Sequence, residues 1–136
     1  MNVIICVDNK MGIMFNGRRQ SRDKILCRKV VSLVGENKLF LKSYSYELFK
    51  DFNLNTIQSA DYLSMAENGD FCFVEGESVK EYNSKIEKLY LFKWNRDYPS
   101  DVKLDIDPLQ GRTMIHTEDF EGNSHEKITL EIYERV

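Results

Sequence analysis

The chain has 136 residues, of which 42% are hydrophobic and 30% charged, as expected for one globular domain with its own core. It has 19 Lys+Arg against 22 Asp+Glu and a net charge of −3, so no basic excess indicates a nucleic-acid partner. No apolar run approaches the ~20 residues that a membrane span requires, and Val3–Val7 is too short for a secretory signal. We therefore expect a single cytoplasmic domain over residues 1–136, without a nucleic-acid or membrane partner.

Cysteine and histidine are few and widely spaced. Cys6, Cys27 and Cys72 form no CxxC pair, so buried reduced thiols are expected rather than a zinc site or disulfides. Two histidines are too few for a histidine-rich metal centre, and no metal is expected. His116 is predicted in a strand and His125 in a loop, neither with a catalytic role. Local spacing suggests no Ser-His-Asp or Cys-His group, although it does not address one assembled in space.

The first two thirds of the chain alternate short apolar runs with helical patterns. Val3–Val7 is continuously apolar, as in a strand buried on both faces, and Asp8–Gln20 is predicted to be a loop. Ser21 is expected to cap a helix that runs to about Val34 and stops at Gly35. The other expected strands are Leu39–Leu41, Phe71–Val74 and Leu89–Trp94, and the other helical segments are Tyr44–Phe52, Ser59–Met65 and Ser78–Tyr82.

The last part of the chain has a different pattern. Arg112–Thr117 and Lys127–Tyr133 alternate apolar and polar residues, and the loop Glu121–His125 predicts that they pair antiparallel. The whole pattern predicts an α/β fold whose mostly parallel central sheet carries antiparallel C-terminal edge strands. Ligands usually bind beyond the carboxyl ends of such parallel strands. Those ends lead here into Asp8–Gln20, Lys42–Ser45 and Glu75–Ser78.

Six segments carry a resemblance along nearly the whole chain: Ile5–Gly17, Asp23–Val34, Leu39–Glu47, Phe71–Gly76, Ile86–Leu91 and Gly122–Arg135. They resemble segments of the dihydrofolate reductase family in the same order. These are the first strand and mobile loop, the long substrate-facing helix, the strand and helix of the cofactor motif, the strand that ends in the paired glycines, the strand that follows it, and the final hairpin with the terminal strand. The resemblance implies a three-layer dihydrofolate reductase-like fold for a short, divergent member.

The resemblance also implies site residues. Asp23 would match the carboxylic acid that delivers a proton to the pterin. A structural role explains an aspartate at this position equally well, because a negative charge in the first turn interacts favourably with the helix dipole. NADPH is the implied cofactor. Its binding residues would be Lys42, Ser43, Ser45, Gly76, Glu77 and Ser78, and the ligand would lie against Cys6, Gly17, Ile25 and Phe92.

Several departures from the family pattern fall where ligands bind. Arg19, Gln20 and Ser21 occupy the position of the proline-tryptophan pair, and the loop is shortened. The paired glycines become Glu75-Gly76, which puts a carboxylate where a cofactor phosphate would lie. The Gly-Arg-x-Thr motif becomes Lys42–Ser45, which lacks the forked guanidinium of arginine.

A deletion follows the predicted helix at Tyr44–Phe52. Only Lys50–Asn55 remains where the family carries a strand and the arginine that binds the substrate carboxylate. The loss of this strand and arginine would remove both the clamp for the acid tail of the substrate and much of the pocket for the far end of the cofactor.

Three functions remain open from the sequence. The first is a divergent protein that binds a small anionic ligand or a protein partner and does not reduce dihydrofolate. The second is an NADPH-dependent reductase of a pterin-like or other small heterocycle. The third is a regulatory or neutralising protein that contacts its partner through the basic cluster Arg18–Lys29 or through the aromatic residues Tyr44, Tyr46, Phe49 and Phe52. A solvated helix face also explains the basic cluster, and core packing also explains the aromatic residues. Whether the protein is an enzyme, and its oligomeric state, stay undecided.

Overall fold

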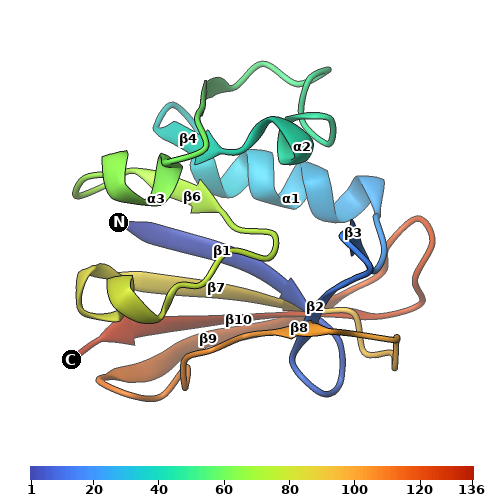
Figure 1. Cartoon of the computed structure of the whole chain (residues 1–136). Coiled ribbons are helices and arrows are strands. Elements are labelled where there is room, and N and C mark those ends of the chain that lie inside the picture. Colours follow the sequence, from blue (N-terminus) through green and yellow to red (C-terminus); the bar gives the residue numbers. More distant parts are fainter.

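Apolar runs from both ends of the chain belong to one seven-stranded sheet with the order β5-β4-β6-β1-β7-β10-β9 (Figure 1). The computed structural model describes all 136 residues. The sheet contains β1 (Asn2–Val7), β4 (Lys38–Leu41), β5 (Asn55–Gln58), β6 (Phe71–Phe73), β7 (Lys88–Lys93), β9 (Arg112–Phe120) and β10 (Ile128–Arg135).

Strand directions confirm the predicted mixed sheet. β1 pairs parallel with β6 and β7, and β4 pairs parallel with β5 and β6. β10 runs antiparallel to both β7 and β9, which forms the edge. Because β1, β4 and β6 share one direction, their carboxyl ends meet at one edge of the molecule, where a ligand site is expected.

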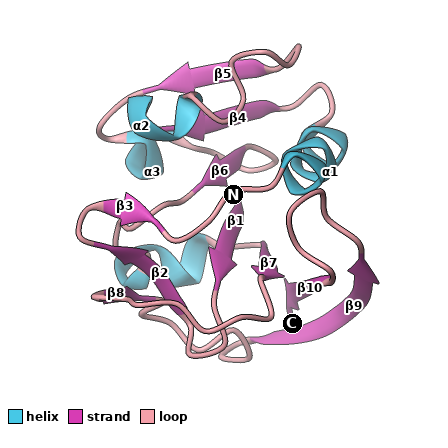
Figure 2. Cartoon of the chain, turned by 90° about the vertical axis from the view of Figure 1, so that its right-hand side faces the viewer, coloured by secondary structure: helices cyan, strands magenta, loops and turns pink.

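The sheet separates two hydrophobic cores, and successive side chains of its central strands point alternately into one and the other. Val3, Ile5 and Leu91 belong to the core on one face, whereas Ile4 and Phe92 belong to the core on the other. Figure 2 shows α1 on one side of the sheet and the small second sheet on the other. These layers bear out the expected three-layer arrangement. The remaining elements are β2 (Gly12–Phe15), β3 (Arg18–Arg19), β8 (Val102–Lys103), α1 (Lys24–Val34), α2 (Ser43–Tyr46), α3 (Tyr62–Met65) and the 3-10 helix η1 (Lys80–Lys85).

The start of α1 corrects one prediction. Asp23, not Ser21, is the N-cap, because its Oδ1 accepts the backbone N–H groups of Ile25 and Leu26 at 2.9 and 3.2 Å. The predicted end at Gly35 is confirmed: this residue has φ 58° and donates its N–H to Val31 O.

The segment Asp8–Gln20, predicted as a loop, contains β2 and β3. They are too short to give a periodic signal, and pairing with each other and with β8 supplies their hydrogen bonds. The predicted loss of a strand after Phe49 is also wrong, since β5 pairs in parallel with β4. The helix predicted over Tyr44–Phe52 ends at Tyr46 and continues as turns.

None of the helices combines the length and the apolar content that a membrane crossing requires.

The two cores predict a difference between buried and exposed leucines. Leu91 in β7 has no exposed surface, whereas Leu109 is 59% exposed. Leu91→Ala is expected to lower the free energy of unfolding by about 3 kcal/mol through a cavity. Leu109→Ala should stay within about 0.5 kcal/mol of the parent chain in the same urea titration. Equal losses would contradict this placement of the core.

Candidate functional site

A buried ion pair lies where the carboxyl ends of β1, β4 and β6 meet. The Arg19 guanidinium donates two parallel hydrogen bonds to the Glu75 carboxylate, from Nε to Oε2 and from Nη2 to Oε1, both at 2.9 Å. Ser45 Oγ donates to the same Oε1 at 2.8 Å. Glu75 is only 7% exposed and Ser45 is fully buried. A buried carboxylate needs such partners, and the fork geometry is the strongest that a protein offers it.

Tyr44 supports the guanidinium of this pair. Its hydroxyl accepts the Arg19 backbone N–H at 3.0 Å, its carbonyl accepts from Nη2 at 3.2 Å, and its ring centroid lies 4.2 Å from Arg19 Cζ. Burial alone would lower the pKa of Arg19, but the hydrogen bonds and charge of Glu75 raise it above its ordinary value. Arg19 therefore stays charged at any physiological pH.

A second ion pair lies beside the first. Lys42 Nζ donates to Glu77 Oε2 at 2.6 Å and to the Glu75 carbonyl at 2.5 Å. The Tyr62 hydroxyl donates to the other oxygen of Glu77. Burial, followed by the hydrogen bond to Glu77, raises the pKa of Tyr62 well above its ordinary value. Gly76 joins the two acidic residues with φ 101°, a conformation that favours glycine.

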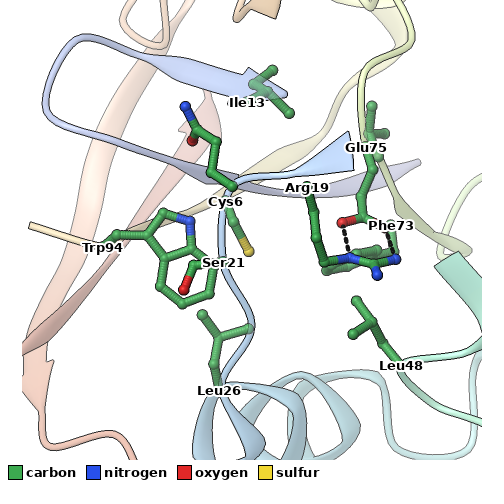
Figure 3. Close-up of a pocket in the computed structure, with 11 residues that line it drawn as sticks. Cys6, Ile13, Arg19, Ser21, Leu26, Leu48, Phe73, Glu75 and Trp94 are labelled. Carbon is green, nitrogen blue, oxygen red and sulfur yellow. Dashed lines mark hydrogen bonds and ion pairs between the residues drawn. The ribbon is translucent and has the colours of Figure 1, made fainter. Parts of the chain in front are cut away.

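The cavity at this edge is small. Its free space is about 20 Å³, which suits about one water molecule. Arg19 and Glu75 contribute its polar wall, as Figure 3 shows. Burial, and next the charge of Glu75, raises the pKa of the Cys6 thiol, which keeps this thiol protonated. The other lining residues are Ile13, Gln20, Ser21, Leu26, Leu48, Phe73, Val74 and Trp94.

The Asp23 carboxylate joins the start of α1 to the loop before β10. Its side chain has no exposed surface. Besides the helix N–H groups, it accepts the N–H groups of Asn123 and Ser124 at 3.2 and 3.0 Å. Burial alone would raise the pKa of Asp23, but these bonds, together with those from Leu26 and His125, hold it well below its usual range. Asp23 is therefore a permanent anion.

His125 lies beside Asp23 and is 4% exposed. Its Nδ1 is 3.0 Å from Asp23 Oδ2. Its Nε2 faces two hydroxyls, Ser21 Oγ at 3.0 Å and Tyr98 OH at 3.2 Å. Trp94 stacks on the imidazole ring, with the centroids 4.6 Å apart.

The residues that the resemblance implied are only partly close together. Lys42, Ser45, Gly76 and Glu77 surround Glu75, and Cys6 lines the cavity. The others do not line it. Gly17 lies in the exposed turn between β2 and β3, Ile25 in α1, Phe92 fully buried in β7, Ser43 exposed at the start of α2, and Ser78 exposed with its hydroxyl on Asp105.

The basic and aromatic clusters are divided by the fold. Arg19 is bound to Glu75 and Lys29 Nζ to Glu118 at 2.8 Å, whereas Arg18, Arg22, Lys24 and Arg28 are exposed. Phe49 is 1% exposed and packs edge-to-face on Phe73 at 5.0 Å, so it is a core residue, whereas Tyr44, Tyr46 and Phe52 are half-buried.

Sequence reasoning missed Tyr62 and the buried environment of His125. Tyr62 lies in a segment with a helical pattern, in which an aromatic residue is expected to pack in the core, so nothing in the sequence marks it as a site residue. His125 is predicted correctly as a loop residue, but its partners Ser21 and Asp23 lie more than 100 positions away. Only the order of segments implied by the resemblance could have placed the final loop against the start of α1.

No protein-family model matches the chain, and no curated protein sequence matches it. Its structure is similar to that of a dihydrofolate reductase from Enterococcus faecalis solved in complex with NADP(H) and RAB-propyl. The TM-score is 0.68 at 14% sequence identity, and the match covers 98% of this chain and 95% of that chain. The chain has a dihydrofolate reductase-like fold. The similarity implied by six scattered segments is therefore confirmed at the level of the fold.

The depressed pKa of Asp23 predicts acid sensitivity. A carboxylate whose folded pKa lies below its unfolded value of about 3.9 stabilises the fold fully above that value, and this stabilisation is lost as the pH falls toward the folded pKa. Asp23→Asn should lower the free energy of unfolding at pH 7 by about 3 kcal/mol and flatten its decline below pH 5. Asp97→Asn, an exposed control, should change neither quantity in urea titrations across pH. An unchanged acid slope in Asp23→Asn would contradict the burial of this charge.

The close approach of the final loop to α1 predicts a requirement for glycine. A Cβ on Gly122 would lie 2.8 Å from the Asp23 Cγ. Gly122→Ala should therefore destabilise the fold by about 2 kcal/mol, measured as a drop in the thermal midpoint. Gly69→Ala is the control for backbone strain, because Gly69 has a positive φ and no atom within 4 Å of the added Cβ. A smaller loss for Gly122 than for Gly69 would contradict the packing of this loop.

Proposed function

We propose that this protein binds a small anionic ligand between Arg19, Ser45 and Lys42, and does not reduce dihydrofolate. The observation that carries the proposal is the forked hydrogen bonding of Arg19 to Glu75. A carboxylate or phosphate presents the same two oxygens to a guanidinium. Glu75 therefore acts as an internal substitute for the ligand.

The donors around Glu75 support this proposal. Ser45 Oγ and the Arg19 guanidinium already converge on one oxygen, Oε1, at 2.8 and 2.9 Å. Lys42 Nζ adds a second cation beside them, held by Glu77. An anion that displaces the Glu75 side chain would gain these donors, and Glu75 would move into solvent. Affinity is then a competition between the ligand and the internal carboxylate.

The residues at this edge fit NADPH poorly. The Glu75 carboxylate, 7% exposed, points its charge at the donors that a cofactor phosphate would need. The cavity of about 20 Å³ leaves no room for a pterin ring.

A reductase of a small heterocycle is the second candidate. It is supported by the fold and by the solved dihydrofolate reductase that was complexed with NADP(H). It would require the Arg19–Glu75 pair to open. An acidic segment of a protein partner is a further source of the same carboxylate chemistry, and the exposed Arg18 and Arg22 lie near enough in sequence to extend its contacts.

Replacing Glu75 tests the competition directly. Glu75→Gln keeps the shape of the side chain but removes the competing charge, so we expect it to bind inorganic pyrophosphate about tenfold more tightly than the parent chain in isothermal titration calorimetry. The double variant Glu75→Gln/Arg19→Ala should lose this gain. Glu81→Gln is the matched control, because Glu81 is an exposed glutamate on η1.

Two outcomes would contradict the proposal. One is equal pyrophosphate affinity in the parent chain and Glu75→Gln, with both folded by their thermal midpoints. The other is a gain that survives the loss of Arg19, since the anion would then bind elsewhere.

A further inference from the structure

We propose that Ser21, His125 and Asp23 form a hydrolytic site, with Ser21 as the nucleophile, His125 as the general base and Asp23 as a positioning residue. The substrates assigned to it are esters of short carboxylic acids. This activity differs in its chemistry from anion binding at Arg19, although Ser21 and Arg19 line the same cavity.

The three side chains form a continuous hydrogen-bonded row. Ser21 Oγ lies 3.0 Å from His125 Nε2, and His125 Nδ1 lies 3.0 Å from Asp23 Oδ2. These are the distances at which a base can take a proton from a hydroxyl and be oriented by a carboxylate. One nitrogen of the imidazole ring faces the hydroxyl and the opposite nitrogen faces the carboxylate. The first can therefore take a proton while the carboxylate orients the ring through the second.

The charge of Asp23 decides which nitrogen of His125 carries the proton. As a permanent anion, Asp23 only accepts hydrogen bonds, so Nδ1 must carry the proton that it donates. In the neutral ring this leaves the Nε2 lone pair for the two hydroxyls that face it. Ser21 is the nearer of the two at 3.0 Å, against 3.2 Å for Tyr98, and of the two only Ser21 lines the cavity.

The imidazole is held rigidly. Its side chain is 1% exposed, Trp94 stacks on one face at 4.6 Å, and Ser124 Oγ lies 3.0 Å from Nδ1. Ser124 Oγ also donates to Asp23 Oδ2 at 3.1 Å. Because these contacts already fix the orientation of the base, little conformational entropy is lost when it reacts.

The position of Ser21 gives its hydroxyl access to substrate. Ser21 is half-buried, and Figure 3 shows it beside Trp94 and Leu26 at the edge of the cavity. The nearby wall is mostly apolar, and the free space of about 20 Å³, close to that of one water molecule, restricts a bound acyl group to the smallest ones. The backbone N–H groups of Ser21 and Arg22 donate to no acceptor within the protein, so both remain available as hydrogen-bond donors next to the nucleophile in sequence.

The reaction follows from these roles. Ser21 Oγ attacks the carbonyl carbon, its proton moves to His125 Nε2, and the carbonyl electron pair moves onto oxygen. The tetrahedral species collapses, the bond to the leaving alcohol breaks, and that alcohol takes the proton from Nε2. Water then attacks the acetyl-serine, gives its proton to Nε2, and acetate leaves as Ser21 recovers its proton.

Covalent labelling tests the nucleophile. Methanesulfonyl fluoride, whose methyl group is no larger than that of an acetyl ester, should sulfonylate the protein once, at Ser21, as located by mass spectrometry of its peptides. The protein should also hydrolyse p-nitrophenyl acetate about 100-fold faster than Ser21→Ala. Ser64→Ala is the control, because Ser64 is exposed on α3 and bonds only to Asp61 O. It should behave as the parent chain in both assays.

The roles of His125 and Asp23 need different measurements. His125→Gln should abolish labelling while Trp94 fluorescence shows whether the fold is kept. Asp23→Asn should lower kcat for p-nitrophenyl acetate and leave KM unchanged, because it disturbs the tautomer rather than binding.

Ser21→Ala decides the matter even if the other two variants fail to fold, since the Ser21 side chain bonds only to His125. Absence of a Ser21 adduct would overturn the proposal and leave the row a purely structural network. So would equal hydrolysis by the parent chain and Ser21→Ala.

Discussion

The buried carboxylate of Asp23 is the constraint on which this end of the molecule depends. Its side chain has no exposed surface, so its charge must be met by protein donors. Four backbone N–H groups meet it, two from α1 and two from the loop before β10. Because these donors come from segments about 100 positions apart, the carboxylate locks the first helix to the last hairpin. That lock also sets the positions of His125 and Ser21.

The same physical requirement applies at the carboxyl ends of the central strands. Glu75 is a second buried carboxylate, and Arg19, Ser45 and the segment around Tyr44 supply its donors. The Arg19–Glu75 pair lies at the carboxyl ends of the central strands of this dihydrofolate reductase-like fold. Internal charges therefore occupy the place where the fold would receive a ligand. An open site would need either a competing anion or a movement of Glu75.

The sequence predicts the parts of the fold whose signal is local. The apolar run at Val3–Val7 marks the central strand, and the alternation in Lys127–Tyr133 marks the final hairpin. The short strands β2, β3 and β5 are not predicted, because their sequences are too short to show a hydrophobic period. They form because they pair with neighbouring strands. The choice between Ser21 and Asp23 as the helix cap also escapes it, since both residues are good caps. Only the donors of residues 123 and 124 favour Asp23.

The site shows the same division. Glu75 stands out in sequence as a carboxylate that replaces a glycine, and the structure gives it a role through Arg19, which the sequence shows only as part of a basic cluster. The environment of His125 is non-local, and no spacing rule reaches it. An unusual residue type at one position can therefore indicate a candidate site from the sequence alone. The partners of that residue are known only once the fold brings distant segments together.

The oxidation of NADPH in the presence of dihydrofolate tests the central claim most directly. It can be followed by the loss of NADPH absorbance with the parent chain. The closed Arg19–Glu75 pair predicts a rate no higher than that of buffer at any dihydrofolate concentration. A saturable rate that disappears in Ser45→Ala would contradict the account, because it would show that the edge of the sheet opens to the cofactor despite Glu75.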